Sequence, residues 1–428
     1  MKHGEDTIVA LSSGAPPAAI GIIRVSGTRA SAALEHLGAA IPAPRRASVR
    51  TLRDSAGDVL DEALVLWLPG PNTSTGEDTV ELHCHGGRAV IAAVEEALLS
   101  VDGFRRAAPG EFTRRAFANG RMDLAQAEGL ADLLFAETEL QRRVLQSSAT
   151  GALSQAFEGW RSRLLGLGAQ VEAALDFDDE GDVDGLSRAF FAEVDRLAIE
   201  IGEQLARPQI ERLRDGVRVV LAGPPNAGKS TLFNAILRNE AAIVSPIAGT
   251  TRDVLERSVA IDGIPLTLVD TAGLHEASED EIEQVGMERA RAAVDAADIV
   301  LWLGPEGTGP QGAWEIEARC DDAAHHPKRA PRLRLSAKTG EGIDGLVGEI
   351  TACARSLLPK PGEQAVNARQ HALLHDASTA LAGIEANTDL LVVAEQLRSA
   401  RVAFDRIMGH ATTEDMLDAL FGRFCIGK

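Results

Sequence analysis

The 428-residue sequence contains no tyrosine, and only 4 % of its residues are aromatic. Proteins that bind single strands of nucleic acid without sequence preference stack the bases on aromatic side chains, so this composition excludes such a platform. Cysteine is also scarce. Cys84, Cys320, Cys353 and Cys425 are scattered and form no Cys-x-x-Cys pair, which excludes a disulfide framework and a zinc ribbon.

Long apolar runs are missing as well. No segment is long and apolar enough to span a bilayer, and the opening "MKHGEDTIVALSSG" does not have the form of a secretory signal peptide. The formal charge of −20 argues against a protein that coats a nucleic-acid duplex, although one local basic patch could still bind RNA. We therefore expect a reduced, soluble protein of the cytoplasm with no membrane attachment.

The sequence ends in "RFCIGK", which places Cys425 four residues from the end. Lys428 is not a residue that completes a prenylation signal, so a lipid anchor is not expected. A frayed end is one interpretation. Apolar residues precede and enter this ending and favour a docked helix whose end is held in a site. They are Leu417, Leu420, Phe421, Phe424 and Ile426.

The pattern of the sequence changes three times. Residues 1–118 combine short β-like runs, such as "AIGIIRVSG" and "DTVELHCHGG", with one helical run, "AVIAAVEEALLS", which predicts an α+β domain. Helical periodicity follows over 119–214, strand–helix alternation over 215–358, and helical periodicity again over 359–428. The predicted fold is therefore an N-terminal α+β domain followed by a discontinuous helical domain that carries an inserted α/β domain.

The segment "GPPNAGKST", Gly223 to Thr231, fits the phosphate-loop pattern G-x-x-x-x-G-K-[ST] between a strand and a helix. Backbone N–H groups of such a loop cradle phosphate oxygens. Lys229 is expected to reach the β- and γ-phosphates and Ser230 to bind Mg²⁺. The alternative is a chance glycine-rich turn, which the strand–helix context disfavours.

Three further segments indicate GTP and predict a P-loop GTPase domain of the Ras-like α/β type. "GTTRD" supplies Thr251 for Mg²⁺, "LVDTAG" supplies Asp270 and Gly273, and "SAK" is typical of the loop beside a guanine base. The GTP contacts expected from these motifs are Asn226, Ala227, Gly228, Lys229, Ser230, Thr231, Gly249, Thr250, Thr251, Asp270, Thr271, Ala272, Gly273, Asp321, Ser336, Ala337 and Lys338.

One element of the GTP site is degenerate. "ARCD", Ala318 to Asp321, stands where Asn-Lys-x-Asp is expected. Asp321 could still accept from the guanine N–H groups, and Arg319 could cover the ring. A lost buried polar contact costs about 1–3 kcal/mol, so weaker affinity or relaxed base selectivity is possible.

The residue after Asp270-x-x-Gly273 is Leu274, which cannot orient a water molecule as the glutamine of Ras does. Asn226 supplies an oxygen that could hold a monovalent cation beside the phosphates. Such a cation would neutralise developing charge as an arginine finger does. No such arginine is evident within the chain, although Arg252 keeps that alternative open.

Taken along its whole length, the sequence resembles the MnmE (TrmE) family of potassium-dependent tRNA modification GTPases. The resemblance rests on "GIIRVSG", "STGEDTVELHCHGG", "PGEFTRRAFANGRMDLAQAE", "GPPNAGKST", "SPIAGTTRDV", "DTAGL", "SAKTGEG" and "FCIGK". It implies a homodimer, K⁺ bound by Asn226, Ser245, Ile247 and Thr250, and a water oriented by Glu283. It adds Ser245, Pro246, Ile247 and Ala248 to the expected GTP contacts. It also implies a complex with an FAD- and NADH-dependent flavoprotein subunit that modifies C5 of the wobble uridine of tRNA.

The resemblance further implies a tetrahydrofolate derivative, in the 5,10-methylene or 5-formyl form, bound by the N-terminal domain. Arg24, Glu81, Arg121 and Lys428 match its contacts, although lysine is common at the position of Arg121. The resemblance places Cys425 near the reacting one-carbon unit. Whether Cys425 is a nucleophile, a proton donor, a positioning group or a structural cysteine stays open.

Other interpretations are also open. His83 and His85 share one face of a strand, but no third metal ligand is evident, and His85 is better suited to line the folate pocket. The basic segments "RRASVR", Arg45 to Arg50, and "TRR", Thr113 to Arg115, could contact RNA phosphates or simply be surface charge. Alternative functions are a GTP-controlled ribosome-assembly switch and a folate-binding module with a degenerate GTPase.

Overall fold

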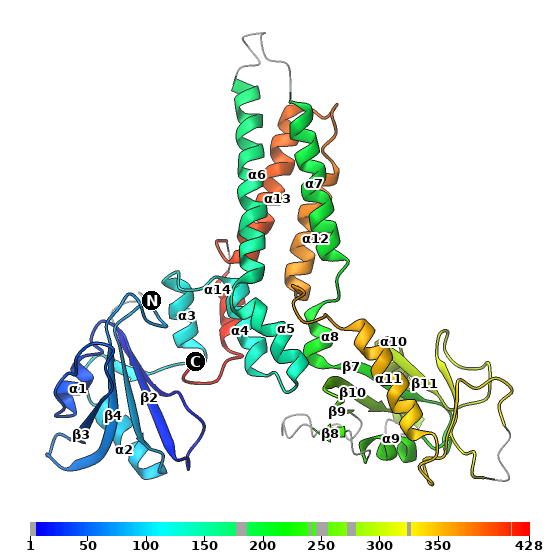
Figure 1. Cartoon of the computed structure of the whole chain (residues 1–428), viewed down its shortest axis with the longest axis horizontal. Helices are drawn as coiled ribbons and strands as arrows, with labels where there is room; N and C mark the ends of the chain where they lie inside the picture. Colours follow the sequence, from blue (N-terminus) through cyan, green and yellow to red (C-terminus); the bar gives the residue numbers. More distant parts are fainter. Residues whose placement is uncertain are drawn as a thin grey trace. The chain divides into compact units, whose positions relative to one another are not determined.

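The computed structural model describes residues 6–176, 186–238, 242–244, 256–271, 280–322, 327–411 and 413–428. Backbone contacts divide the chain into two compact units. The first is Met1–Ala131 with Asp405–Lys428, and the second is Asp132–Phe404. The expected fold class is confirmed, because the chain has an α+β part, a helical part and an α/β part (Figure 1).

The strands are β1 (Thr7–Leu11), β2 (Ile20–Ser26), β3 (Ser48–Arg53), β4 (Val59–Leu68), β5 (Thr79–His85), β6 (Phe104–Arg106), β7 (Val217–Ala222), β8 (Ala242–Val244), β9 (Glu256–Ile261), β10 (Ile264–Asp270), β11 (Ile299–Trp302), β12 (Trp314–Glu317) and β13 (Leu333–Arg334). The helices are α1 (Ala32–His36), α2 (Arg88–Leu99), α3 (Glu111–Ala118), α4 (Leu124–Leu134), α5 (Glu139–Ala149), α6 (Ala152–Asp176), α7 (Arg188–Leu205), α8 (Ile210–Asp215), α9 (Lys229–Leu237), α10 (Asp280–Asp295), α11 (Ile343–Leu357), α12 (Ala368–Ala382), α13 (Leu390–Met408) and α14 (Glu414–Phe421).

The first unit contains a six-stranded sheet in the order β3-β4-β5-β2-β1-β6. Its neighbouring strands are antiparallel except for the parallel pair β1 and β6. The apolar face of α2 covers one side of the sheet, where Ile91 and Val94 share a buried cluster with Ile23 and Val25. Because side chains alternate along a strand, Arg24 lies on the opposite face.

Helix α14 packs on α3 and the start of α4 within the first unit. Leu417, Leu420 and Phe421 join Phe424 in a buried cluster, and α4 contributes Leu124, Ala127 and Ala131. The ring centroids of Phe421 and Phe424 lie 6.1 Å apart. Four of the five apolar residues near the end of the sequence therefore form a core, as the docked interpretation predicts, whereas Ile426 is 60 % exposed.

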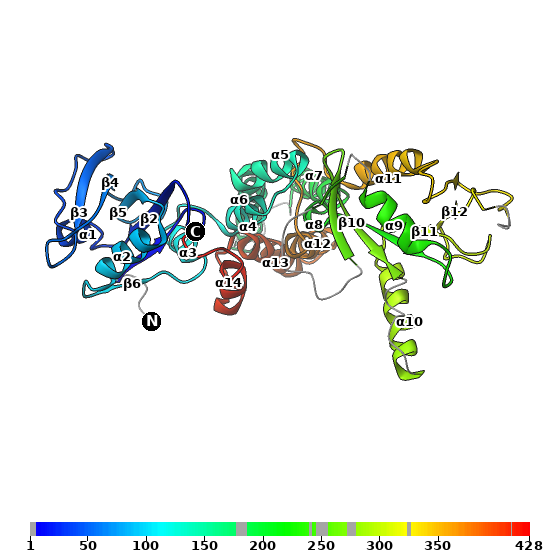
Figure 2. The same cartoon turned by 90° about the horizontal axis from the view of Figure 1, so that it is seen from below.

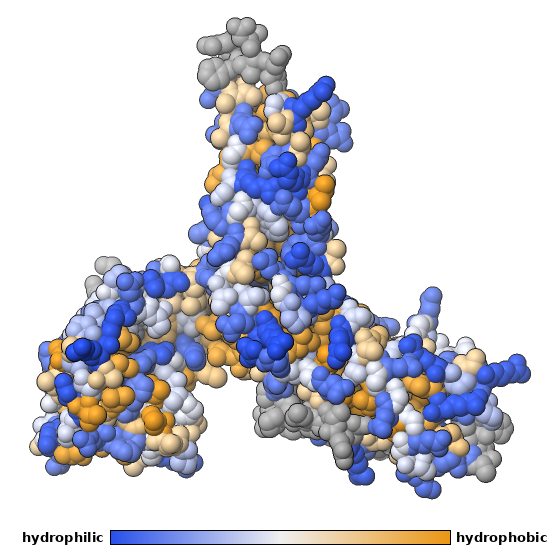
Figure 3. Space-filling view, viewed as in Figure 1, coloured by the Kyte–Doolittle hydropathy of each residue, from blue (hydrophilic) through white to orange (hydrophobic). Residues whose placement is uncertain are grey.

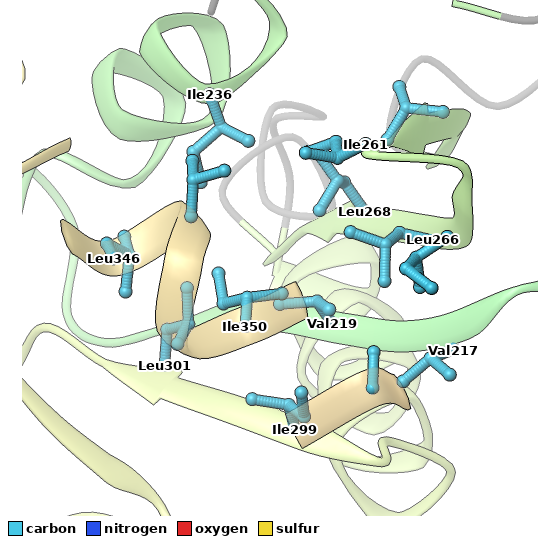
Figure 4. Close-up of a cluster of buried hydrophobic side chains, with 14 of the residues drawn as sticks. Val217, Val219, Ile236, Ile261, Leu266, Leu268, Ile299, Leu301, Leu346 and Ile350 are labelled. Carbon is cyan, nitrogen blue, oxygen red and sulfur yellow. The ribbon is translucent and has the colours of Figure 1, made fainter. Parts of the chain in front are cut away.

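The second unit contains a seven-stranded sheet in the order β13-β12-β11-β7-β10-β9-β8. Central strand β7 is parallel to both β10 and β11, and the run "VRVVLA" has the near-continuous apolar character of a strand buried on both faces. Side chains from the sheet, α9 and α11 form one buried cluster (Figure 4). Helices α9 and α11 lie close together beside the strands. Helix α10 contacts β7 and projects from the sheet (Figure 2).

The helical part of the second unit is held by an aromatic cluster and by N-terminal caps. Phe157 and Trp160 of α6 and Phe404 of α13 have ring centroids 5.9–6.2 Å apart. Capping boxes at Thr138 and Asn367 satisfy the first N–H groups of α5 and α12. Helices α6 and α7 present mostly hydrophilic side chains, with isolated hydrophobic ones among them (Figure 3). None of the helices in the described ranges is both long and apolar enough to cross a membrane.

Candidate functional site

The phosphate loop connects β7 to α9 at the centre of the seven-stranded sheet. Gly223, Asn226 and Gly228 have positive φ angles of 149°, 61° and 97°. This backbone turns sharply and ends directly at Lys229, the first residue of α9. Because β7 pairs with β10 on one side and β11 on the other, the loop lies where parallel α/β sheets bind ligands.

Lys229 is buried, with 3 % of its surface exposed. Its Nζ donates hydrogen bonds to the carbonyl oxygens of Gly223 at 2.8 Å and Pro224 at 2.9 Å. Burial lowers the pKa of Lys229, and the negative charge of nearby Asp270 opposes this shift. A buried ammonium group held by carbonyl oxygens at a helix N-terminus fits a phosphate ligand, which would supply a second negative charge.

The end of β10 brings two expected GTP contacts beside the loop. Asp270 is 7 % exposed and lies opposite Leu221 in the parallel register with β7. The Thr271 hydroxyl donates to the Leu221 carbonyl oxygen at 2.8 Å, which fixes the start of the following segment. Ser230 is exposed in the first turn of α9. A hydroxyl and a carboxylate are oxygen ligands that suit Mg²⁺.

Several expected site residues lie outside the described part of the chain or have no described side chain. The backbone of Glu283 lies in α10, but its side chain is among those not described. The residues outside the described ranges are Ser245, Pro246, Ile247, Ala248, Gly249, Thr250, Thr251, Ala272 and Gly273.

A cavity of about 490 Å³ adjoins the phosphate loop where the guanine base is expected. It joins the degenerate "ARCD" segment to the "SAK" segment, as the sequence predicts. The Ser336 hydroxyl donates a hydrogen bond to Asp321, which holds the pKa of that carboxyl below its usual value and keeps it an acceptor. The cavity is lined by Gly228, Thr231, Ala318, Arg319, Asp321, Asp322, Ala337 and Lys338.

Arg319 makes a contact that the sequence did not indicate. Its guanidinium donates a hydrogen bond to the backbone carbonyl oxygen of Asn226 in the phosphate loop. Arg319 therefore both lines the base cavity and braces the loop, whereas Ala318 contributes no polar side chain. The extended guanidinium offers more donors than a lysine, so it can serve both surfaces.

A second group of expected site residues lies on the face of the six-stranded sheet opposite α2. Arg24 and Glu81 are cross-strand partners, and the Arg24 Nε and Nη2 donate to one Glu81 oxygen at 3.0 and 2.9 Å. The Arg24 guanidinium also lies 5.7 Å from the ring centroid of Phe112. His83 Nε2 lies 3.5 Å from the second Glu81 oxygen. Among the described side chains, no group of three potential ligands that could hold a metal ion is found.

His85 points to a different partner. Its Nδ1 lies 2.7 Å from a carboxylate oxygen of Asp61, a residue that is 8 % exposed. The hydrogen bond to Asp61 raises the pKa of His85, with the carboxylate charge acting in the same direction. The sequence did not indicate Asp61 as a partner of His85, because nothing distinguishes it from other acidic residues in strands.

The C-terminal tail is held against α3 by backbone contacts. The N–H of Gly110 donates to the Cys425 carbonyl oxygen at 3.5 Å, and the N–H of Phe112 donates to the Lys428 carbonyl oxygen at 3.2 Å. A Cβ atom on Gly110 would overlap the carbonyl oxygen of Phe421, and one on Gly427 would overlap the carbonyl oxygen of Leu11. The glycines of "PGEF" and "CIGK" thus allow two backbones to meet.

These contacts bring most of the expected folate residues together. Arg24 and the backbone of Lys428 both adjoin Phe112, and Glu81 holds Arg24. Cys425 lies exposed in the same tail. The side chain of Arg121 lies beside Gly76, where its Cγ would be 3.3 Å from an added Cβ. The sequence does not single out Phe112, although this residue belongs to "PGEF", the start of one of the segments that carry the family resemblance.

Two family models match the chain: "MnmE helical domain" over residues 124–425 and "GTP-binding protein TrmE N-terminus" over residues 7–121. The chain is 70 % identical over 423 residues to a protein of Erythrobacter litoralis (strain HTCC2594), covering 99 % of this chain and 100 % of the relative. It is 57 % identical over 435 residues to a protein of Novosphingobium aromaticivorans, with 99 % and 100 % coverage. Both relatives are named "tRNA modification GTPase MnmE".

Among solved structures, the G domain of the T. maritima FeoB iron transporter matches 32 % of this chain and 98 % of its own length. Its identity of 24 % and TM-score of 0.23 are too low to support an argument. The two family models and the two near-full-length relatives are sufficient to assign the family without this structural match. The chain therefore belongs to the MnmE family of tRNA modification GTPases.

Proposed function

We propose that this chain hydrolyses GTP as part of the modification of a tRNA wobble uridine at C5. The observation that carries the proposal is the arrangement around Lys229. The buried ammonium group of Lys229 suits the γ-phosphate, and the N-terminus of α9 suits the phosphate chain. The adjoining cavity, which Asp321 lines, suits the guanine base. Full-length relatives named as tRNA modification GTPases support the same assignment.

The residues near the phosphate loop fit Mg²⁺, which would neutralise charge on the β- and γ-phosphates. Ser230 and Asp270 would hold it directly or through water, together with Thr251. Asn226, at the turn of the phosphate loop, would contribute to K⁺ binding with Ser245, Ile247 and Thr250. Glu283 would orient the attacking water, since Leu274 cannot.

For the first unit we propose a tetrahydrofolate derivative as the one-carbon donor, with Arg24, Glu81 and Lys428 among its contacts. The docked tail supports this proposal because it brings Lys428 and Cys425 to the sheet face that carries Arg24. Lys428 offers a cation to a ligand that carries carboxylates. Arg24 is ion-paired with Glu81 at 2.9 Å and offers its remaining N–H donors. Arg121, which lies beside Gly76, would be the fourth contact.

We further propose that the protein works in the cytoplasm as a homodimer, in complex with an FAD- and NADH-dependent flavoprotein. The ribosome-assembly alternative gives no role to the docked "CIGK" tail. The alternative with a decayed GTPase gives no role to Lys229, Asp270 and Asp321, which the structure brings to one region.

Phosphate release tests the nucleotide and the cation together. The full chain should release phosphate from GTP faster than from ATP, and several-fold faster in KCl than in NaCl. Asn226→Ala should remove the difference between the two salts while leaving some turnover. Equal rates in both salts would contradict the K⁺ proposal, and no release from GTP in KCl would contradict the GTPase assignment itself.

A further inference from the structure

We infer that the arginine edge, defined as Arg45, Arg46, Arg50 and Arg53, is a docking surface for the phosphate backbone of tRNA. The inference rests on the proposed function, because tRNA is the partner in question. All four residues lie within 41–53, a segment without Asp or Glu in a chain of formal charge −20. They precede or belong to β3, one of the two edge strands of the six-stranded sheet.

The two basic segments that could contact RNA, "RRASVR" and "TRR", differ in how their arginines are paired in the structure. Arg114 pairs with Glu414 and with Asp418, the latter at 2.6 Å. Arg115 is 8 % exposed and pairs with Asp6 at 2.7 Å and with Glu77 at 3.0 Å. Their charges are neutralised within the protein. "TRR" is thus a structural segment, and RNA contact is left to "RRASVR".

The arginine edge differs in its partners. Within the described ranges, the hydrogen bonds recorded for the side chains of Arg45, Arg50 and Arg53 go to backbone carbonyl oxygens, and no ion pair is recorded for any of the four arginines. Arg45 donates to Asn72, Arg50 to Ala40 at 3.1 Å, and Arg53 to Gly57 at 2.9 Å. A carbonyl oxygen orients a guanidinium but does not cancel its charge. Each guanidinium has five N–H donors, so donors remain for a ligand.

A nearby acid is engaged in its own turn. Asp54 follows Arg53 directly, but one of its oxygens accepts the N–H groups of Ala56 and Asp58, both at 2.9 Å. Arg45, Arg46 and Arg53 are exposed, and Arg45 adopts a left-handed φ of 59° that directs the chain into β3. Carbonyl oxygens orient the guanidinium groups of Arg45 and Arg53, and Arg46 adds a third exposed positive charge. Guanidinium groups without an ion-pair partner suit phosphate oxygens, which they can bind in bidentate fashion.

The chemistry favours an RNA duplex backbone over reading of bases. The segment contains no aromatic residue that could stack on a base. Phosphate contacts fix the position of the nucleic acid and carry no sequence information. The competing explanation is that the charges only protect an edge strand from pairing with other chains. That explanation predicts self-association, rather than loss of tRNA affinity, when the arginines are removed.

The test compares salt dependence of tRNA binding in three full-length variants. The first is Arg45→Gln/Arg46→Gln/Arg53→Gln, and the second replaces the same residues with lysine. The third, Arg142→Gln/Arg143→Gln/Arg398→Gln, is a matched control, because these arginines are exposed by 54–59 % and ion-paired on helices. The probe is a tRNA transcript with an unmodified wobble uridine, titrated between about 50 and 200 mM salt.

We expect the first variant to bind roughly tenfold or more weakly at about 100 mM salt, with the slope of log K against log salt reduced by about 2 to 3. The lysine variant and the control should keep most of the affinity and slope, and GTP turnover without tRNA should stay unchanged in all three. Unchanged tRNA affinity in the first variant, or its self-association without loss of affinity, would overturn the inference and leave the proposed function standing. A wild-type chain that hydrolyses GTP but does not bind tRNA would overturn the tRNA part of the proposed function as well.

Discussion

For Lys229, the sequence motif predicts the role of the side chain but not its burial. The pattern G-x-x-x-x-G-K-[ST] predicts that the ammonium group reaches the phosphates, and in the structure that group bonds to carbonyl oxygens of the phosphate loop. The motif does not reveal that the lysine is buried, with its charged form disfavoured by desolvation. The sequence likewise predicts Arg319 at the base site but not its hydrogen bond to Asn226, because that contact depends on two segments far apart in the sequence.

Replacing Lys229 should therefore separate nucleotide binding from folding. Lys229→Met keeps an apolar stem and removes a buried charge, so the unfolding temperature without ligand should change little. GTP with Mg²⁺ should raise the unfolding temperature of the wild type but not of the variant, because a charge-assisted contact worth about 1.5–3 kcal/mol is lost. Thermal scans with and without GTP would measure both effects. An undiminished shift in the variant would show that Lys229 does not contact the nucleotide.

Glu283 should affect turnover rather than binding. A carboxylate that orients water stabilises the transition state more than the bound substrate. Glu283→Ala should therefore lower kcat about 10²–10⁴-fold, the range for positioned acid–base groups, with little change in GTP affinity. Single-turnover hydrolysis and a nucleotide titration would give the two values. Normal hydrolysis by the variant would remove Glu283 from the mechanism.

The pairing of His85 with Asp61 makes a prediction about pH. The pKa of His85 is raised by its hydrogen bond to Asp61, so the imidazolium should persist to a higher pH than in an unfolded chain. Any contribution of this pair to stability is then complete below the unfolded pKa and is lost as the pH rises through the folded one. Titration of the His85 ring by NMR should give a pKa above 6.5, and Asp61→Asn should lower it. An identical titration in the two proteins would contradict the pairing.

At the scale of elements, periodicity predicts those strands and helices that have one clear face. "DTIVAL", "AIGIIRVSG", "EALVLWLPG" and "DTVELHCHGG" correspond to β1, β2, β4 and β5, and "AVIAAVEEALLS" corresponds to α2. The sequence did not indicate β3, because arginines at this sheet edge obscure the alternation. It did not indicate β6 either, because three residues are too few for a periodic signal.

The meeting of the tail with β1 can be tested at one glycine. Gly427 has a φ of 96°, and a Cβ there would overlap the Leu11 backbone. Gly427→Ala should therefore displace the tail, which would appear as faster proteolysis near the C-terminus and weaker folate binding. Gly362→Ala is the matched control, since Gly362 has a φ of 89° but open space around it. Gly362→Ala should leave both properties unchanged, and the same result for Gly427→Ala would show that the contact with Leu11 does not hold the tail.

At the scale of the whole molecule, the C-terminal end of the chain packs with the N-terminal part, although the two are far apart in the sequence. The sequence predicts 359–428 as a single helical segment, but contacts assign Asp405–Lys428 to the unit that begins at the N-terminus. Helical periodicity says which residues are buried, not which partner buries them. The partner surface comes from Gly110 and Phe112, more than 300 positions away in the sequence, so local pattern could not reveal it.

This association predicts that the tail serves only one of the two units. Deletion of Cys425–Lys428 removes the backbone hydrogen bonds to Gly110 and Phe112, so folate binding should weaken and tRNA modification should be lost. GTP hydrolysis should stay near the wild-type rate, because the phosphate loop and the base cavity belong to the other unit.

Cys425→Ser is nearly isosteric and should keep folate binding, yet lose modification if the thiol takes part in the chemistry. Folate titration, tRNA nucleoside analysis and phosphate release on both variants would decide between these roles. Unchanged modified uridine after the deletion would show that the docked tail contributes nothing to the reaction.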